Sequence, residues 1–285
     1  MFYLFILPTF VPLKYFNMAI VISFANNKGG VGKTTTTLIM GQAFSRMKRK
    51  TLLIDLDSQA NLTLLTGDIK PTNHELTVLE AMLDKNVLPI ISVAPNLDLI
   101  PANLKLANFD DKASSRPDKL YLMDDLVHRI RAEYDFILID CPPALGTVIY
   151  NAFIASDYVV MVSTPDELSY QGLRMIYKVF DNVKGQPRLN PNLELAGTII
   201  TKYEKNKNSE LFEKVLKNDP ELNIIEPVIK KATGIAQALS ARRCIFDSDS
   251  RMAAHPATQN FVDVAKNLAL RVLTDAEEKQ KSNKK

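Results

Sequence analysis

Short apolar runs rich in β-branched residues alternate along the chain with longer segments in which apolar positions recur every three or four residues. Uninterrupted apolar runs are typical of strands buried on both faces, and helical spacing between them is typical of a parallel sheet covered by helices. The pattern predicts strands at 19–25, 51–56, 97–102, 136–140, 158–163 and 195–200. It predicts helices near 34–47, 77–84, 118–132, 148–155, 168–184, 208–218 and 257–273. We therefore expect one α/β domain with a mainly parallel sheet and helices on both faces.

The two ends of the chain depart from this pattern. Residues 1–17 are apolar, but the stretch is too short to span a membrane, and it lacks the basic start and small-residue cleavage site of a signal peptide. We interpret residues 1–18 as an N-terminal extension, with Met18 a natural start for the first strand; a short membrane or partner anchor is the alternative. Residues 274–285 are polar and charged, and we expect a solvated, frayed tail.

The last predicted helix carries an apolar stripe at helical spacing. We expect this stripe to face the core, with a partner-binding face as the alternative. Its members are Phe261, Val264, Ala265, Leu268 and Val272. The folded domain would then cover residues 19–273.

Bulk composition limits the class of protein. The chain has 285 residues, of which 46% are hydrophobic and 24% charged, as in globular proteins. A net charge of +3 permits a local nucleic-acid patch without arguing for one. Cys141 and Cys244 lack the spacing of a metal site or a disulfide framework, so a reducing, cytoplasmic setting is expected.

The stretch NNKGGVGKTTTT, residues 26–37, lies between the first predicted strand and the first predicted helix. It resembles the phosphate-binding pattern G-x-x-x-x-G-K-[ST] in the context that this pattern requires. We expect Lys33 to bridge the β- and γ-phosphates of a nucleotide, Thr34 to ligate Mg²⁺ and Thr35 to contact the α-phosphate. Backbone N–H groups are expected to surround the phosphates at Gly29, Gly30, Val31 and Gly32. Asn27 replaces the first glycine, and we expect it to adopt a positive φ angle, which asparagine tolerates.

Lys28 adds a second lysine at the start of the loop. KGGVGKTT resembles the deviant Walker A loop of the ParA/MinD/Soj family of P-loop ATPases, whose pattern is K-G-G-x-G-K-[ST]. The resemblance implies that Lys28 crosses an ATP-sandwiched dimer to contact the partner's nucleotide. Lys28 and Lys33 are therefore candidate catalytic residues, acting as an arginine finger does by placing positive charge at the transition state.

Three carboxylates follow predicted strands. LLIDLDSQANL, residues 52–62, resembles the family's D-x-D-P-Q-x-N segment with Ser58 in place of proline. The resemblance implies that Asp57 polarises the attacking water near Mg²⁺ and that Asp55 is a magnesium-shell or structural residue; capping of the next turn is the alternative for both. YDFILIDCPP, residues 134–143, resembles a Walker B strand that delivers Asp140 to Mg²⁺, and Cys141 belongs to this motif without a catalytic role.

Resemblance to the family extends over residues 19–273. The segment GTIITKYEKN, residues 197–206, follows a late strand, where the family's loops commonly form the nucleotide base pocket. Thr201, Lys202 and Tyr203 are candidates for that pocket, with an ordinary role at the strand end as the alternative.

Relatives in this family do different work. MinD-type proteins end in a short amphipathic membrane helix, and residues 274–285 have almost no apolar face. ParA-type proteins bind DNA without sequence preference through basic residues. Candidates here are Lys230, Lys231, Arg242 and Arg243. A second basic cluster at 46–50 ends a predicted helix, where capping of the last carbonyls is favoured over DNA binding.

These features together predict a Mg²⁺-dependent ParA-like ATPase that partitions plasmid or chromosomal DNA. The expected partners are ATP, a second copy of the chain, non-specific nucleoid DNA and a ParB-like protein that stimulates hydrolysis. Stable membrane association is not expected, nor is specific operator binding, because residues 1–18 are too short for a winged helix-turn-helix. The alternatives are a MinD-like spatial regulator and an ATP-using metabolic enzyme of the dethiobiotin synthetase type.

Overall fold

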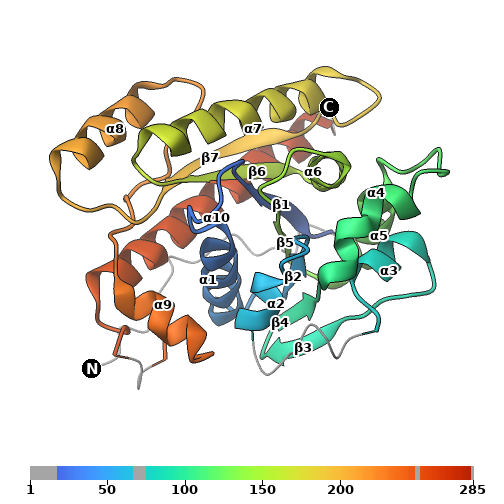
Figure 1. The fold of residues 1–285 in the computed structure, drawn as a ribbon, viewed down its shortest axis with the longest axis horizontal. Coiled ribbons are helices and arrows are strands. Elements are labelled where there is room, and N and C mark those ends of the chain that lie inside the picture. The colour runs from blue at the N-terminus through green and yellow to red at the C-terminus, as the bar shows by residue number, and fades with distance from the viewer. Residues whose placement is uncertain (1–17, 67–74, 248–250, 284–285) are drawn as a thin grey trace.

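The computed structural model describes residues 18–66, 75–247 and 251–283. The expected extension at 1–17 therefore lies outside the described residues. One sheet has the strand order β3-β4-β2-β5-β1-β6-β7, and all pairings are parallel except that of β3 with β4 (Figure 1). The strands are β1 (Ile20–Ala25), β2 (Thr51–Asp55), β3 (Ile91–Ala94), β4 (Leu97–Ile100), β5 (Phe136–Asp140), β6 (Tyr158–Ser163) and β7 (Glu194–Ile200). The predicted α/β fold with a mainly parallel sheet is confirmed.

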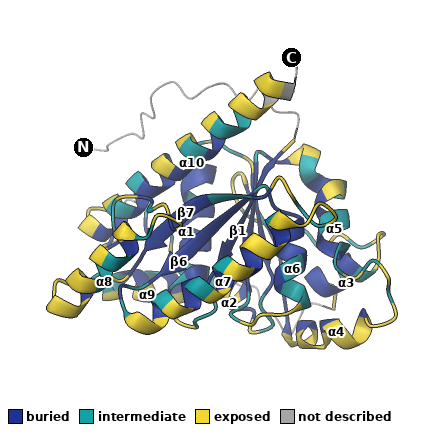
Figure 2. Cartoon of the chain, turned by 90° about the horizontal axis from the view of Figure 1, so that it is seen from above, coloured by how far each residue is buried: buried dark blue, intermediate teal, exposed yellow. Residues whose placement is uncertain are grey.

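Helices cover both faces of this sheet. They are α1 (Lys33–Arg46), α2 (Asn61–Leu65), α3 (Val78–Leu83), α4 (Phe109–Lys112), α5 (Leu122–Ile130), α6 (Thr147–Ile154), α7 (Glu167–Gly185), α8 (Lys207–Asn218), α9 (Thr233–Ser240) and α10 (Pro256–Asn283). One apolar cluster joins the sheet to α3, α5, α6 and α7, and a second joins it to α1, α9 and α10. Figure 2 shows the buried strands between helices whose outer surfaces are exposed.

Alternation along the strands explains the two clusters. Val21 of β1 belongs to the first cluster, whereas Ile20 and Ile22 belong to the second. Successive strand residues point to opposite faces, so a strand covered on both sides must be apolar throughout. All six predicted strands are present. Most are apolar along nearly their whole length, whereas Asp98 interrupts the run in β4.

The edge strand β3 and the short helices α2, α4 and α9 were not predicted. β3 alternates between half-buried and exposed positions over four residues, which is too short a signal for a periodicity argument. It pairs antiparallel with β4. The local segment 91–94 therefore gives little information about its strand conformation.

Residues 274–283 form the end of α10 and are not a frayed tail, so that prediction was wrong. The Tyr158 hydroxyl donates to Asp275 Oδ2 over 2.5 Å, and Lys279 pairs with Asp275 over 2.8 Å. The Lys279 ammonium also lies 5.2 Å from the Tyr158 ring centre. These contacts bind the charged end of the helix to the sheet. The apolar stripe from Phe261 to Val272 is buried, as predicted.

The carboxyl ends of three central strands meet at one edge of the sheet. Asp55 at the end of β2 is in register with Asp140 at the end of β5, and Asp140 is in register with Phe24 of β1. The loop 26–32 follows β1 at this edge and leads into α1. Open parallel sheets bind ligands beyond the carboxyl ends of their strands, and the predicted site lies there.

Candidate functional site

The loop between β1 and α1 is anchored by Asn26. Its buried amide donates to the Val162 carbonyl of β6 over 2.7 Å and accepts the Lys28 N–H over 2.8 Å. Gly30 has φ 77° and Gly32 has φ 92°, a left-handed backbone that favours glycine. These two positions explain why the loop needs glycine there.

Asn27 does not adopt a positive φ angle, so the predicted reason for tolerating this residue was wrong. Its amide donates instead to the Met175 sulfur of α7 over 3.0 Å. Since the backbone is not left-handed at this position, glycine is not required for conformational reasons.

Lys33 begins α1 and is buried, with only 7% of its surface exposed. Its ammonium donates to the Lys28 carbonyl over 3.2 Å. Burial lowers the pKa of Lys33, and the negative charges of Asp140 and Asp57 oppose that shift. The ammonium therefore lies in a pocket of the loop, close to two carboxylates.

Asp140 is fully buried beside the first turns of α1. The Thr37 hydroxyl donates to Oδ1 over 3.4 Å, and the Thr34 hydroxyl also hydrogen-bonds the carboxyl group. Burial and the neighbouring Asp55 charge raise its pKa well above the ordinary range, against the lowering effects of Thr34 and Lys33. Oδ2 is buried without a hydrogen-bond partner in the described structure. A buried, unsatisfied carboxylate oxygen next to a threonine hydroxyl fits a Mg²⁺ site.

Asp55 has a structural role. Its Oδ2 accepts the Thr63 N–H over 2.8 Å and the Thr63 hydroxyl over 2.7 Å, and its Oδ1 accepts the Asp57 N–H over 3.2 Å. The residue before α2, Ala60, provides no side-chain cap, so Asp55 satisfies an amide of the first turn from outside the helix. Burial raises the pKa of Asp55 to about 6, although the hydrogen bonds from Thr63 oppose the shift.

Asp57 lies beyond the end of β2 and is half-buried. Its Oδ1 accepts the Gln59 N–H over 3.0 Å, so the carboxylate does cap the next turn. Its charge also contributes to the pKa values of Lys33 and Asp140. The structure thus brings Asp57 to the site that the other two residues form.

The Lys28 side chain lies along the first turns of α7. Its ammonium donates to Asp166 Oδ1 over 2.8 Å and to Ser169 Oγ over 3.1 Å. Asp166 is the N-cap of α7, and it also accepts the Ser169 N–H and the Thr164 hydroxyl. Burial would raise the pKa of Asp166, but the hydrogen bonds from Lys28, Thr164 and Ser169 lower it to about 2.

Of the base-pocket candidates, Thr201 and Lys202 contact the loop itself. The buried Thr201 hydroxyl donates to the Val31 carbonyl over 2.6 Å, and the Lys202 ammonium donates to the Gly30 carbonyl over 2.6 Å. Tyr203 exchanges backbone hydrogen bonds with the segment 229–231. Thr201 and Lys202 therefore support the loop from β7, a role that the sequence did not indicate.

The four basic candidates for DNA contact are exposed and flank α9. Lys230 and Lys231 precede this eight-residue helix, and Arg242 and Arg243 follow it. The helix between the two pairs is about 12 Å long at 1.5 Å per residue. Lys231 pairs with Glu204 over 3.1 Å. The backbone of Lys230 and Lys231 pairs with Tyr203, three residues beyond the carboxyl end of β7.

The cluster at 46–50 lies at the end of α1. Backbone N–H groups of Met47 and Arg49 satisfy the last carbonyls, while the Arg46 side chain pairs with Asp247. The Lys50 ammonium lies 4.6 Å from the Tyr134 ring centre. The capping is therefore made by the backbone, and two of the basic side chains have partners within the fold.

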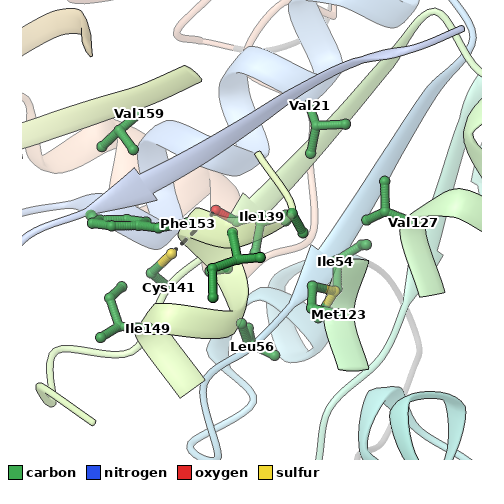
Figure 3. Packing of buried hydrophobic residues seen from close by; sticks show 14 of the residues in the cluster. Val21, Ile54, Leu56, Met123, Val127, Ile139, Cys141, Ile149, Phe153 and Val159 are labelled. Atoms are coloured by element: carbon green, nitrogen blue, oxygen red, sulfur yellow. Dashed lines mark hydrogen bonds between the residues drawn. The ribbon is translucent and has the colours of Figure 1, made fainter. Parts of the chain in front are cut away.

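Cys141 lies in the core beneath the site. Figure 3 shows its side chain in the hydrophobic cluster that includes Ile149 and Phe153. The thiol is 1% exposed, and burial raises its pKa far above the ordinary value. A buried thiol with a raised pKa is unreactive, in agreement with the expectation that Cys141 has no catalytic role.

Lys28, Lys33, Thr34, Asp57 and Asp140 are thus brought together at the carboxyl ends of β1, β2 and β5. Sequence reasoning missed Asp166 and Ser169, which hold Lys28. The signal for them was the stretch PDELS at 165–169, where an aspartate lies two residues before the helix predicted at 168–184 and three before a serine, in position to act as an N-cap.

Comparisons with known proteins agree with this geometry. A family model described as an AAA domain matches residues 19–195. The chromosome partitioning protein ParA of Caulobacter vibrioides is 30% identical over 259 residues, covering 88% of this chain and 94% of the relative. The sporulation initiation inhibitor protein Soj of Bacillus subtilis is 30% identical over 258 residues, covering 88% and 99%. The chain is a member of the ParA/MinD family of P-loop ATPases.

The fold of this ParA/MinD-family chain is similar to solved structures of proteins with different functions. A Borrelia burgdorferi protein assigned to plasmid partition, bound to AMPPNP, superposes with a TM-score of 0.72 at 26% identity and covers 90% of this chain and 99% of its own. Cobyrinic acid a,c-diamide synthase of Mycobacterium smegmatis, with ADP and magnesium, gives 0.75 at 26%, covering 87% and 93%. No helix among the described residues of the ParA/MinD-family chain is long and apolar enough to cross a membrane.

Proposed function

We propose that this chain is a Mg²⁺-dependent ATPase that partitions DNA. The observation that carries the proposal is the convergence of Lys33, Thr34, Asp57 and Asp140 on the loop that also presents Lys28. In this proposal ATP joins two subunits, and the pair binds DNA without sequence preference. A ParB-like protein on the cargo then stimulates hydrolysis and releases the pair.

Roles at the nucleotide follow from position. The Lys33 ammonium would bind the phosphates, because it is buried in the loop and already donates to a carbonyl oxygen. Thr34 and Asp140 would hold Mg²⁺, which neutralises charge on the β- and γ-phosphates when it is bound. Asp57 would orient the attacking water from the end of β2. Lys28 would supply positive charge to the partner's nucleotide.

DNA binding would use the exposed basic residues around α9. Two pairs of cations at the two ends of an eight-residue helix can contact phosphates without reading bases. Pairing two subunits doubles the number of such contacts, so an ATP-dependent pair would bind more tightly than a single chain. A cytoplasmic, nucleoid-associated location follows from this proposal.

Analytical ultracentrifugation with ATP, ADP and no nucleotide tests the proposal. The wild-type chain is expected to pair only with ATP, and Lys28→Ala is expected to lose that pairing and, with it, partner-stimulated hydrolysis. Lys178→Ala, a change of the same charge on an exposed face of α7, is the matched control and should behave as wild type. Normal pairing together with normal stimulated hydrolysis in Lys28→Ala would contradict the role of Lys28.

One observation supports the metabolic alternative, namely the structural likeness to the Mycobacterium smegmatis synthase crystallised with ADP and magnesium. Under that alternative a small molecule would accelerate ATP turnover in the absence of DNA and protein partners. The MinD-like alternative predicts ATP-dependent co-sedimentation with liposomes. Neither result is expected from a partition ATPase.

A further inference from the structure

Lys28 is fixed within its own subunit at three points. Its N–H donates to Asn26 Oδ1 over 2.8 Å, and its carbonyl accepts the Lys33 ammonium over 3.2 Å. Its own ammonium pairs with Asp166 and Ser169 of α7. The residue proposed to act on a partner's nucleotide therefore makes its side-chain contacts in cis.

Helix α7 packs closely against the loop residues Asn26 and Lys28. A Cβ at Gly172 would lie 2.5 Å from Asn26 Oδ1 and 3.3 Å from both the N and Cβ atoms of Lys28. The absence of a side chain at 172 thus allows α7 to approach the loop. Ser169 and Asp166 lie about one and two turns nearer the start of the helix, where they meet the ammonium.

The receiving groups are themselves held in place. Asp166 accepts the Thr164 hydroxyl over 2.5 Å, the Ser169 N–H over 3.0 Å and the Ser169 hydroxyl over 2.9 Å. Ser169 is fully buried. The carboxylate is thus oriented before Lys28 arrives, which reduces the entropy lost when the ion pair forms.

We propose that Asp166 and Ser169 form a cis docking site for the Lys28 ammonium, and that two subunits pair only after Lys28 has left it. The inference rests on the proposed function, because it assumes that pairing uses Lys28. In the docked state Asp166 and Ser169 take up two of the three N–H donors of the ammonium, so full contact with a phosphate of the other subunit's nucleotide draws the lysine away from Asp166. Breaking the docked contact therefore opposes pairing, and nucleotide phosphate must compete with Asp166 for the lysine.

Asp166 is accordingly a positioning residue that sets how readily the subunits pair. Its ion pair with Lys28 is about one-third exposed on each side, so water weakens it but does not abolish it. Asp166→Asn keeps an oxygen that can cap α7 and removes the charge that holds Lys28. Glu167→Gln is the matched control, because it removes the same charge one residue away on an exposed side chain.

The first readout is acylation of the Lys28 amine in nucleotide-free protein, followed by peptide mass spectrometry. Loss of a charge-assisted hydrogen bond should speed labelling about three- to tenfold in Asp166→Asn. Ser169→Ala should change the rate in the same direction, and Glu167→Gln should leave it unchanged. Labelling of Asp166→Asn at the wild-type rate would overturn the docking site, provided that its melting temperature shows a folded protein.

The second readout is the dissociation constant of the ATP-bound pair by sedimentation. Asp166→Asn should lower it about three- to tenfold relative to wild type and Glu167→Gln. An unchanged or raised dissociation constant would show that docking does not oppose pairing. If the wild-type chain failed to pair with ATP at all, the proposed function would fail, and the labelling result would still support or overturn the docking site by itself.

Discussion

At the residue scale, two aspartates near the end of β2 have separate roles. Asp55 is buried and hydrogen-bonded to Thr63. Asp57 is half-buried, and its charge raises the pKa values of Lys33 and Asp140. The sequence motif predicts that both aspartates lie near the nucleotide. The structure shows that the Asp55 carboxylate instead hydrogen-bonds Thr63 of α2. Their mutations should therefore differ in kind.

Asp57→Ala should stop hydrolysis while leaving nucleotide binding and pairing intact. Loss of a residue that orients the attacking water costs about 10²-fold or more in rate. The ATP-bound pair should consequently persist, which sedimentation after mixing with limiting ATP would show as a slowly decaying dimer. Asp110→Ala on the exposed face of α4 is the control, and wild-type turnover in Asp57→Ala would refute the assignment.

Asp55 should make the free energy of unfolding depend on pH. Its pKa in the fold is about 6 against an ordinary 3.8, so the fold disfavours the ionised form. This group therefore contributes most to stability below pH 3.8, and that contribution is lost as the pH rises to about 6. Asp55→Asn cannot ionise, so its stability relative to wild type should improve by about 2–3 kcal/mol between pH 4 and pH 7.

Urea unfolding of nucleotide-free protein at both pH values measures this difference. Asp110→Asn, an exposed carboxylate removed from α4, should show no such trend. A relative stability of Asp55→Asn that stays constant with pH would mean that Asp55 is not held in a destabilised ionised state.

At the element scale, the approach of α7 to the phosphate loop depends on Gly172. A methyl group there would meet Asn26 Oδ1 at 2.5 Å, and that oxygen is held by the Lys28 N–H. Gly172→Ala should destabilise the fold by about 1–3 kcal/mol through overpacking. Nucleotide affinity should also fall, because the loop must move.

Gly185→Ala provides the control on the same helix. No atom lies within 4 Å of a Cβ at that position, so alanine should be tolerated or mildly stabilising. Thermal unfolding and fluorescent-nucleotide titration of both variants compare the two glycines. Equal behaviour of the two variants would show that close approach of α7 to the loop is not needed.

Elements with uninterrupted apolar runs or long helical periodicity could be predicted from the sequence. Every predicted strand is present, and the last helix was placed correctly at its start but ended ten residues too early. Its final turns are polar, and Asp275 in these turns is 117 residues from its partner Tyr158, so the local pattern carries no sign of the contact. The edge strand β3 was missed because four alternating residues give too little periodicity.

Much of the candidate site could be predicted because its residues lie in compact motifs with family resemblance. The fine placement could not. Asp166 is 138 residues from Lys28, and the buried position of Thr201 behind Val31 depends on the order β1-β6-β7. Such contacts are set by the packing of the sheet, which a single sequence does not display.

At the scale of the whole molecule, the basic residues beside α9 should govern DNA affinity without affecting ATP binding. Lys230→Ala with Lys231→Ala should weaken binding to all DNA sequences alike and reduce the salt slope by about one for each lost phosphate contact. Lys112→Ala with Lys119→Ala, on the far side of the sheet, is the matched control. A sequence-dependent loss, or equal loss in the control, would contradict a phosphate-binding role for this pair.

Pairing of two subunits would couple the nucleotide state of this protein to its DNA binding. The most direct test measures binding to a DNA duplex of arbitrary sequence with ATP, ADP and no nucleotide across a salt series, for wild type and Lys28→Ala. We expect tight, salt-sensitive, sequence-indifferent binding by wild type with ATP alone, and weak binding by Lys28→Ala in every nucleotide state. Absence of wild-type binding with ATP at low salt, or equal binding in all nucleotide states, would contradict this coupling.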